Sequence, residues 1–117
     1  MAKPVIYGIA NCDTVKKARK WLEKSGIDYT FHDFRKDGLD QKRLNEWYKN
    51  TSWENLLNKR SRTWRELSES DKTDVTQSKA SKLILAQPNL IKRPVLEFNK
   101  QVTIGFDENI YKALFSS

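Results

Sequence analysis

Residues 5–22 constrain the fold of this 117-residue chain more than any other segment. The apolar run 5–7 is typical of a short buried strand, and Gly8 ends it. Apolar residues then recur at helical spacing, separated mostly by charged ones: Val15, Ala18 and Leu22. The pattern predicts a strand, a tight loop and an amphipathic helix.

Cys12, the only cysteine, stands where this helix begins. The first N–H groups of a helix have no partner inside it and its dipole is positive there, so a thiolate or another anion is stabilised. A lone cysteine is often simply a small buried residue. The polar neighbours Asn11, Asp13 and Thr14 favour an accessible, reactive thiol instead. Basic residues 16 and 17 could support an anion, but taken by themselves they are interpreted as a solvated face.

Composition limits the classes of function. The net charge is +7, but the basic residues are spread along the chain and mixed with acids, which does not indicate a dedicated nucleic-acid arm. Basic charge would instead favour small anions or an acidic protein surface. No apolar run is long enough to span a membrane, and no signal peptide is apparent. One cysteine excludes an internal disulfide, so we expect a reducing, cytoplasmic setting.

The next segment predicts a parallel βαβ unit. The first helix should end near Ser25, with Gly26 in the left-handed position that follows many helices. Residues 27–33 are predicted to form a second strand, followed by a turn at 35–38. His32, the only histidine, is interpreted as a packing residue rather than a metal ligand.

Residues of about 40–87 are predicted to be mainly helical. Asp40 is a candidate N-cap, and 50–52 and 58–63 read as breaks, the second rich in positive charge. A further helix start is expected at 68–71, before a helix that Pro88 ends. The inward face of this last helix is expected to consist of Thr76, Ala80, Leu83 and Ile84. The tryptophans of the segment are interpreted as packing residues with no role in a site: Trp47, Trp53 and Trp64.

The C-terminal part predicts a hairpin and a helix. Strands are expected at 95–98 and 102–104, joined by a turn at 99–101. Asp107 or Glu108 then starts a helix with apolar residues at Ile110, Ala113 and Leu114.

This order of elements, with a cysteine at the start of the first helix, resembles the thioredoxin fold. More specifically, the chain resembles the arsenate-reductase-like (ArsC-like) family that includes the Spx regulators, and above all its YffB-type branch. The resemblance implies an α/β (α+β) fold in one domain, residues 1–117, with a mixed four-stranded sheet and a helical subdomain inserted at about 40–87. It rests on residues that span nearly the whole chain: Tyr7-Gly8-Ile9, Asn11-Cys12-Asp13-Thr14, Leu56-Leu57-Asn58-Lys59-Arg60, Trp64-Arg65-Glu66-Leu67 and Ile91-Lys92-Arg93-Pro94.

The resemblance also implies a site. Cys12 would be the nucleophile, and Arg93 would reach toward its sulfur and bind the anionic substrate. Pro94 matches a proline that is cis in thioredoxin-like folds, and Arg60 matches a second arginine of the Spx and YffB branches. Substrate binding is thus expected from four residues around the catalytic pair: Asn11, Thr14, Arg60 and Pro94.

The chain departs from the arsenate reductases of this family. It has Asn58 and Gly105 where they have arginines, and Gly8 where they have a histidine. Arg60 could compensate for the first loss, but arsenate becomes a weaker expectation as the natural substrate. Val15 stands where many Spx proteins have the second cysteine of a redox switch, so that switch is excluded.

Two functions remain open on these grounds. The first is a glutathione-dependent thiol oxidoreductase in which Cys12 forms a mixed disulfide that an external thiol resolves. It needs no tightly bound cofactor and no metal; its partners would be glutathione or another low-molecular-weight thiol, with glutaredoxin as a further candidate. The second is an Spx-like transcriptional regulator that binds RNA polymerase without turnover.

Overall fold

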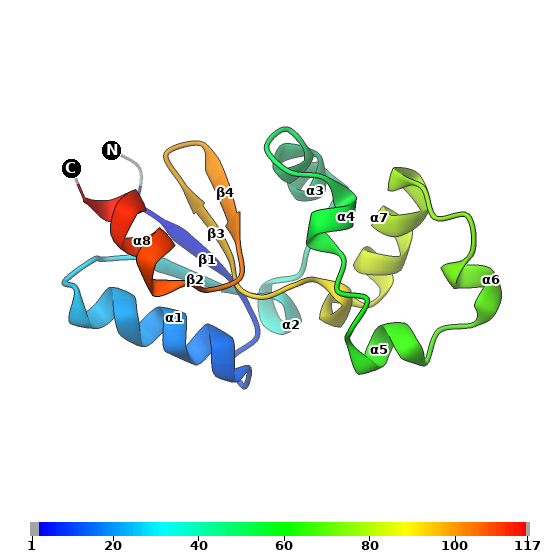
Figure 1. Cartoon of the computed structure of the whole chain (residues 1–117), viewed down its shortest axis with the longest axis horizontal. Helices are drawn as coiled ribbons and strands as arrows, with labels where there is room; N and C mark the ends of the chain where they lie inside the picture. The colour runs from blue at the N-terminus through cyan, green and yellow to red at the C-terminus, as the bar shows by residue number, and fades with distance from the viewer. Residues whose placement is uncertain (1–2, 117) are drawn as a thin grey trace. The chain divides into compact units, whose positions relative to one another are not determined.

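The computed structural model describes residues 3–116, which form two compact units (Figure 1). The first unit contains the chain up to residue 37 and from 93 onward, and the second contains 38–92. The segment 40–87, expected as a helical insertion, lies entirely inside the second unit. None of the helices between residues 3 and 116 combines the length and the apolar character that crossing a membrane requires.

The first unit is built on a four-stranded mixed sheet. Its strands are β1 (Val5–Gly8), β2 (Thr30–Asp33), β3 (Val95–Phe98) and β4 (Gln101–Ile104), in the order β2-β1-β3-β4. β1 runs parallel to β2 and antiparallel to β3, and β3 and β4 form the expected hairpin. The thioredoxin-like arrangement predicted from the sequence is confirmed.

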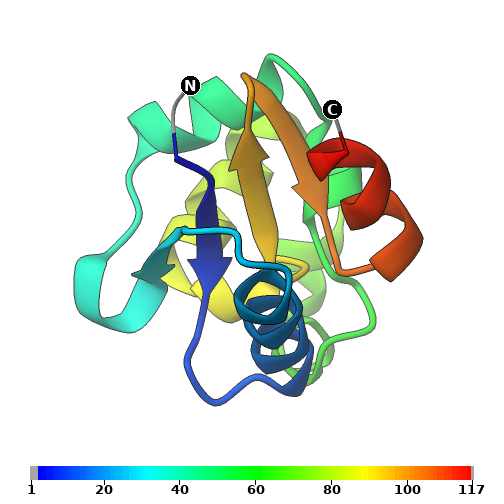
Figure 2. The same ribbon diagram turned by 90° about the vertical axis from the view of Figure 1, so that its left-hand side faces the viewer.

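Two helices, α1 (Asp13–Lys24) and α8 (Glu108–Phe115), cover one face of this sheet (Figure 2). The apolar spacing of α1 explains its placement, because the three residues predicted to face inward are fully buried. They form one cluster with residues of the sheet and of α8: Ile6, Val15, Ala18, Leu22, Leu96 and Tyr111. A ring of aromatic side chains packs around the cluster, including Trp21 edge-on to Tyr111.

Tyr111 contributes an unsatisfied hydroxyl to this core. Its side chain is fully buried, its Oη has no hydrogen-bond partner among residues 3–116, and burial raises the pKa of Tyr111. We expect Tyr111→Phe to increase the free energy of unfolding by about 1 kcal/mol at neutral pH, because an unpaired buried polar group is destabilising. A less stable variant in urea unfolding would show that the hydroxyl has a partner.

The same residue predicts an alkaline effect. An unfolded tyrosine ionises near its ordinary pKa of about 10, whereas the raised pKa of Tyr111 keeps it protonated in the folded state. The free energy of unfolding is therefore unaffected by this group below about pH 10 and falls as the pH rises beyond it. The stability lost between pH 8 and pH 11 should therefore be smaller in Tyr111→Phe than in the wild type.

The second strand is shorter than predicted. β2 begins at Thr30, whose N–H donates to the carbonyl of Pro4 over 2.9 Å, rather than at Ile27. Ile27 instead closes the end of α1, because its N–H donates to the Leu22 carbonyl and Gly26 has φ +71°. The turn expected at 35–38 is replaced by a short helix, α2 (Phe34–Asp37), which begins one residue earlier.

The C-terminal elements confirm most of the prediction. Asn99 and Lys100 both have positive φ in the hairpin turn, and Asp107 is the N-cap of α8, accepting from the N–H groups of Asn109 and Ile110. Ile110 itself is 49% exposed, since the helix turns its aromatic residues toward the core instead.

The second unit consists of short helices: α3 (Gln41–Tyr48), α4 (Trp53–Leu56), α5 (Arg62–Arg65), α6 (Glu69–Lys72), α7 (Gln77–Ala86) and the 3-10 turn η1 (Pro88–Leu90). An isolated antiparallel bridge joins Leu57 to Ile91, and Tyr48 Oη lies 2.9 Å from Ser81 Oγ. Large apolar residues from these segments are fully buried, among them Trp47, Leu44, Leu56, Ile84 and Leu90.

One packing prediction in this unit is wrong. Thr76 does not face inward but is the exposed N-cap of α7, where its hydroxyl accepts from the N–H of Lys79. Among the tryptophans expected to pack in this unit, Trp47 is fully buried, and Trp53 and Trp64 are half-buried.

Candidate active site

Cys12 lies on the loop that connects β1 to α1, directly before the first helical residue. Its backbone is extended (φ −93°, ψ 125°), its N–H donates to the Ile9 carbonyl over 3.3 Å, and its carbonyl accepts from Lys16 N over 2.9 Å. Cys12 is therefore the N-cap residue of α1, as the sequence predicts.

The start of α1 differs from that of the other α-helices in residues 3–116. A serine, threonine or aspartate oxygen accepts a hydrogen bond from the first turn of α3, α4, α5, α6, α7 and α8, and Asp33 does the same for α2. Cys12 provides no such bond at α1. The first N–H groups of α1 thus remain open to an anion next to the sulfur.

The thiol is accessible but also supported from below. Cys12 is a free cysteine of intermediate exposure, and it packs against the apolar cluster beneath α1. Asn11 and Thr14, expected to bind substrate, are both exposed on either side of it. Cys12 thus contacts the core and is also partly exposed.

Arg93 and Pro94 approach the same edge of the sheet from a distant part of the chain. In the β1–β3 register Tyr7 pairs with Val95, so Pro94 and Arg93 come next, where β1 ends and turns toward Cys12. The Arg93–Pro94 peptide bond is cis, as expected. Pro94 is buried and its carbonyl accepts from Gly105 N over 2.8 Å, which fixes the backbone that carries the half-buried Arg93.

Asp33 is a residue at this edge that the sequence interpretation missed. It ends β2 opposite Gly8, it is only 6% exposed, and its Oδ1 accepts from Arg35 N over 2.8 Å. The Asp33 side chain thus caps α2 and places a buried acidic residue in the strand that neighbours β1. An acidic residue at the end of an apolar strand, followed by a helical turn, is the signal that could have identified it.

Gly8 brings α1 close to β1. A Cβ atom at Gly8 would lie 2.6 Å from Cγ2 of Val15, far inside van der Waals contact. In the sequence, Gly8 and Val15 are two separate departures from the proteins that the chain resembles. In the structure they are one packing feature directly beneath the Cys12 loop.

Arg60 belongs to the second unit, so its expected role beside Cys12 stays a prediction. Its backbone N–H donates to Asn58 Oδ1 over 3.0 Å, and its side chain is exposed. The neighbouring cation Lys59 lies over the ring of Trp64, 5.6 Å from its centroid.

His32 lies on β2 opposite Tyr7, and the two ring centroids are 4.8 Å apart. Tyr7 is buried and donates its hydroxyl to Glu97 Oε1 over 3.0 Å. This arrangement agrees with the interpretation of His32 as a packing residue.

The exposed face of α1 carries four lysines, Lys16, Lys17, Lys20 and Lys24. Three of the pairs between them are spaced three or four residues apart, and each such like-charge pair destabilises a helix by about 0.2–0.5 kcal/mol. The first two also lie near the positive end of the helix dipole. The sequence here does not favour maximal helix stability.

Comparisons with known proteins agree with this geometry. The model of the ArsC family matches residues 7–114. An uncharacterised protein of Haemophilus influenzae is 44% identical over 95% of this chain and 97% of its own length. The global transcriptional regulator Spx 2 of Bacillus anthracis is 30% identical over 94% of this chain and 86% of its own. The solved structure of a YffB protein superposes with a TM-score of 0.94 at 42% identity, covering 97% of this chain and all of the other. The chain therefore belongs to the ArsC family.

Proposed function

We propose that this protein is a glutathione-dependent thiol oxidoreductase in which Cys12 is the nucleophile. One observation carries the proposal: the only cysteine occupies the N-cap position of α1, where an oxygen-bearing side chain would normally accept a hydrogen bond. The first N–H groups of α1 therefore lie uncapped near Cys12, and the β1–β3 register places Arg93 at the same edge of the sheet. A helix that needed only stability would favour serine, aspartate or asparagine at this position.

The reaction would have two exchange steps. The Cys12 thiolate attacks one sulfur of a glutathione mixed disulfide, the new S–S bond joins Cys12 to glutathione, and the other thiolate leaves and takes up a proton. A second glutathione thiolate then attacks the glutathione sulfur of this adduct, releasing glutathione disulfide and restoring Cys12. The external thiol is required because the chain has no second cysteine.

Charge complementarity supports glutathione as the co-substrate. Glutathione has two carboxylates, and a guanidinium can bind a carboxylate through two parallel hydrogen bonds. Arg93 would supply this contact, and the family resemblance makes Arg60 a second candidate. Asn11 and Thr14 would contact the remaining polar groups, and Pro94 would shape the site beside the sulfur. The reaction also requires a compartment that contains reduced glutathione, so the proposed location is the cytoplasm.

The proposal predicts one stable adduct. After incubation with glutathione disulfide, intact-mass analysis should show a single glutathione on the wild-type protein, which excess reduced glutathione removes. An unmodified protein, under conditions that modify a control thiol, would contradict the proposal. Cys12→Ser is the matched control: it should form no adduct and remain folded, because serine is a good N-cap residue.

A regulator is the second candidate, favoured by the 30% identity to a global transcriptional regulator. In that case the protein would bind RNA polymerase and Cys12 would not turn over. Purified RNA polymerase binding with micromolar or higher affinity, together with no catalysed reduction of a glutathione mixed disulfide, would favour this function over the first.

A further inference from the structure

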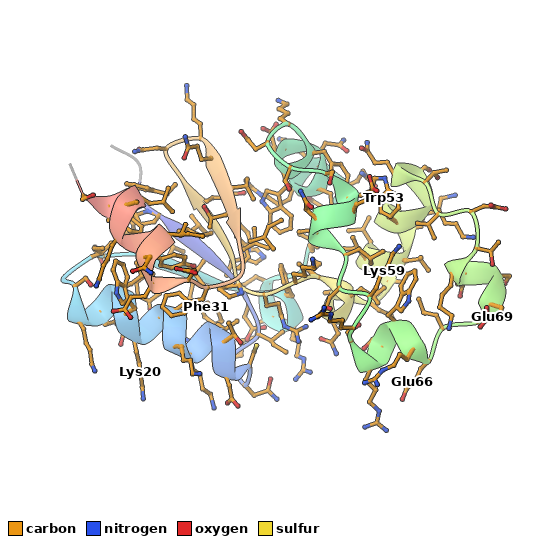
Figure 3. All side chains as sticks on the ribbon, in the orientation of Figure 1. Lys20, Phe31, Trp53, Lys59, Glu66 and Glu69 are labelled. Atoms are coloured by element: carbon orange, nitrogen blue, oxygen red, sulfur yellow. The ribbon has the colours of Figure 1, made fainter. Side chains whose placement is uncertain are left out.

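Helix α1 presents a lysine stripe, which we define as Lys16, Lys17, Lys20 and Lys24. At 3.6 residues per turn the four fall within a sector of about 100°, opposite the buried face of the helix. All four are exposed, and Figure 3 shows Lys20 extending away from the sheet. The stripe begins one turn after Cys12 and continues to the last residue of the helix.

The stripe is not neutralised by the protein. No ion pair or hydrogen bond from any of the four side chains occurs within residues 3–116, although Asp13 shares their sector. Elsewhere exposed lysines do pair with acids, for example Lys3 with Asp28 and Lys112 with Glu108. The first unit has eleven basic and eight acidic residues, so without the stripe its charges nearly balance. Its positive charge is therefore concentrated on α1.

We propose that the lysine stripe docks an acidic protein surface, whose cysteine exchanges a disulfide with Cys12. This inference rests on the proposed thiol chemistry and adds a macromolecular partner to it. Charge complementarity identifies the partner as acidic, and the position of Cys12 at the head of the stripe identifies it as a carrier of a thiol or disulfide. A nucleic acid is disfavoured because no aromatic ring is exposed between the lysines for base stacking.

The dimensions argue against a small thiol as the only reactant. Lys20 and Lys24 lie about 12 and 18 Å beyond Cys12 along the helix axis. A tripeptide such as glutathione is at most about 10 Å long when extended, so it cannot reach Lys24 while its sulfur reacts. At 0.1 M salt the Debye length is also about 10 Å, which screens the distant lysines from a small anion.

The test uses two synthetic peptides, each with one cysteine held as a mixed disulfide with an aromatic thiol. One peptide has glutamates on one side of the cysteine for about 20 Å, and the other has glutamines there. The Cys12 thiolate attacks the peptide sulfur and releases the coloured aromatic thiolate, so the rate is read directly. We expect the acidic peptide to react faster with the wild type, with an advantage that falls as salt is raised.

The deciding variant is Lys20→Gln/Lys24→Gln. It should slow the acidic peptide by about threefold to tenfold and leave the neutral peptide and glutathione disulfide unchanged. Lys20→Arg/Lys24→Arg should retain the wild-type rate, and Lys100→Gln/Lys112→Gln removes two charges from the same unit as a control. Equal rates of both peptides with the wild type, or equal losses in the variant, would overturn the docking proposal.

Two outcomes separate this inference from its foundation. If Cys12 reacts with small disulfides but reacts equally fast with both peptides, the proposed thiol function still stands and only the proposed docking surface is contradicted. A second experiment compares two inhibitors of the reaction between Cys12 and the acidic peptide: a single-stranded oligonucleotide and an acidic peptide without cysteine. If the oligonucleotide inhibits at much lower concentrations, the lysine stripe binds nucleic acid instead, and the docking proposal is overturned.

Discussion

Replacing Arg93 by alanine should slow the reaction of Cys12 with glutathione disulfide by roughly tenfold to a hundredfold. A hydrogen-bonding partner with a full charge contributes about 1.5–3 kcal/mol, which corresponds to this range. Arg93 is held at the end of β1 by the buried Pro94 and the strand that follows. Arg93→Lys should recover only part of the rate, because an ammonium group cannot form the planar two-bond contact.

The measurement compares an anionic reagent with a neutral one. Glutathione disulfide should show the full loss, whereas alkylation by iodoacetamide should change much less. Arg35→Ala, an exposed arginine in the same unit, controls for the loss of net charge, and thermal unfolding of each variant controls for the fold. If Arg93→Ala and Arg35→Ala have equal effects, Arg93 contributes only to the general field of the protein.

Gly8→Ala should lower the free energy of unfolding by about 1–3 kcal/mol, as expected for overpacking. At a position with ordinary backbone angles, glycine to alanine usually stabilises by reducing the entropy of the unfolded chain. Here the new Cβ would lie 2.6 Å from Val15 Cγ2. Valine in a helix has one strongly preferred χ1, so the methyl group cannot turn away without cost.

A double-mutant cycle isolates this contact. Val15→Ala alone leaves a cavity and is destabilising, but the added Cβ of Gly8→Ala can occupy part of that space. The double variant should therefore be more stable than the sum of the two single changes predicts. Additive effects in denaturant unfolding would show that the strand and the helix do not press on each other here.

The sequence predicts most of the first unit because its elements follow from local rules. The apolar spacing of α1, the positive φ of Gly26, the hairpin at Asn99 and the cap at Asp107 each depend on a few neighbouring residues. The position of Cys12 at the start of α1 is local in the same sense, and it was predicted correctly.

Other features depend on contacts that sequence neighbours do not define. The start of β2 is set by its register with β1, where Thr30 faces Val5, and not by the apolar residues before it. The steric link between Gly8 and Val15 and the burial of Asp33 likewise exist only once the sheet and α1 pack together. Arg93 was associated with Cys12 through a family resemblance, because nothing in its own neighbourhood identifies a partner 81 positions away.

The pairing of β1 with β3 has a consequence for the folding of the chain during its synthesis on the ribosome. The sulfur is synthesised early and its arginine 81 residues later, with the whole second unit translated between them. At about 5–20 residues per second, the nascent chain contains Cys12 but not yet Arg93 for roughly 4–16 seconds. Only after the segment that contains β3 has emerged and joined the sheet can the arginine take its place beside the cysteine loop. A truncated or stalled chain would therefore contain Cys12, the proposed nucleophile, without Arg93, the residue proposed to bind the anion.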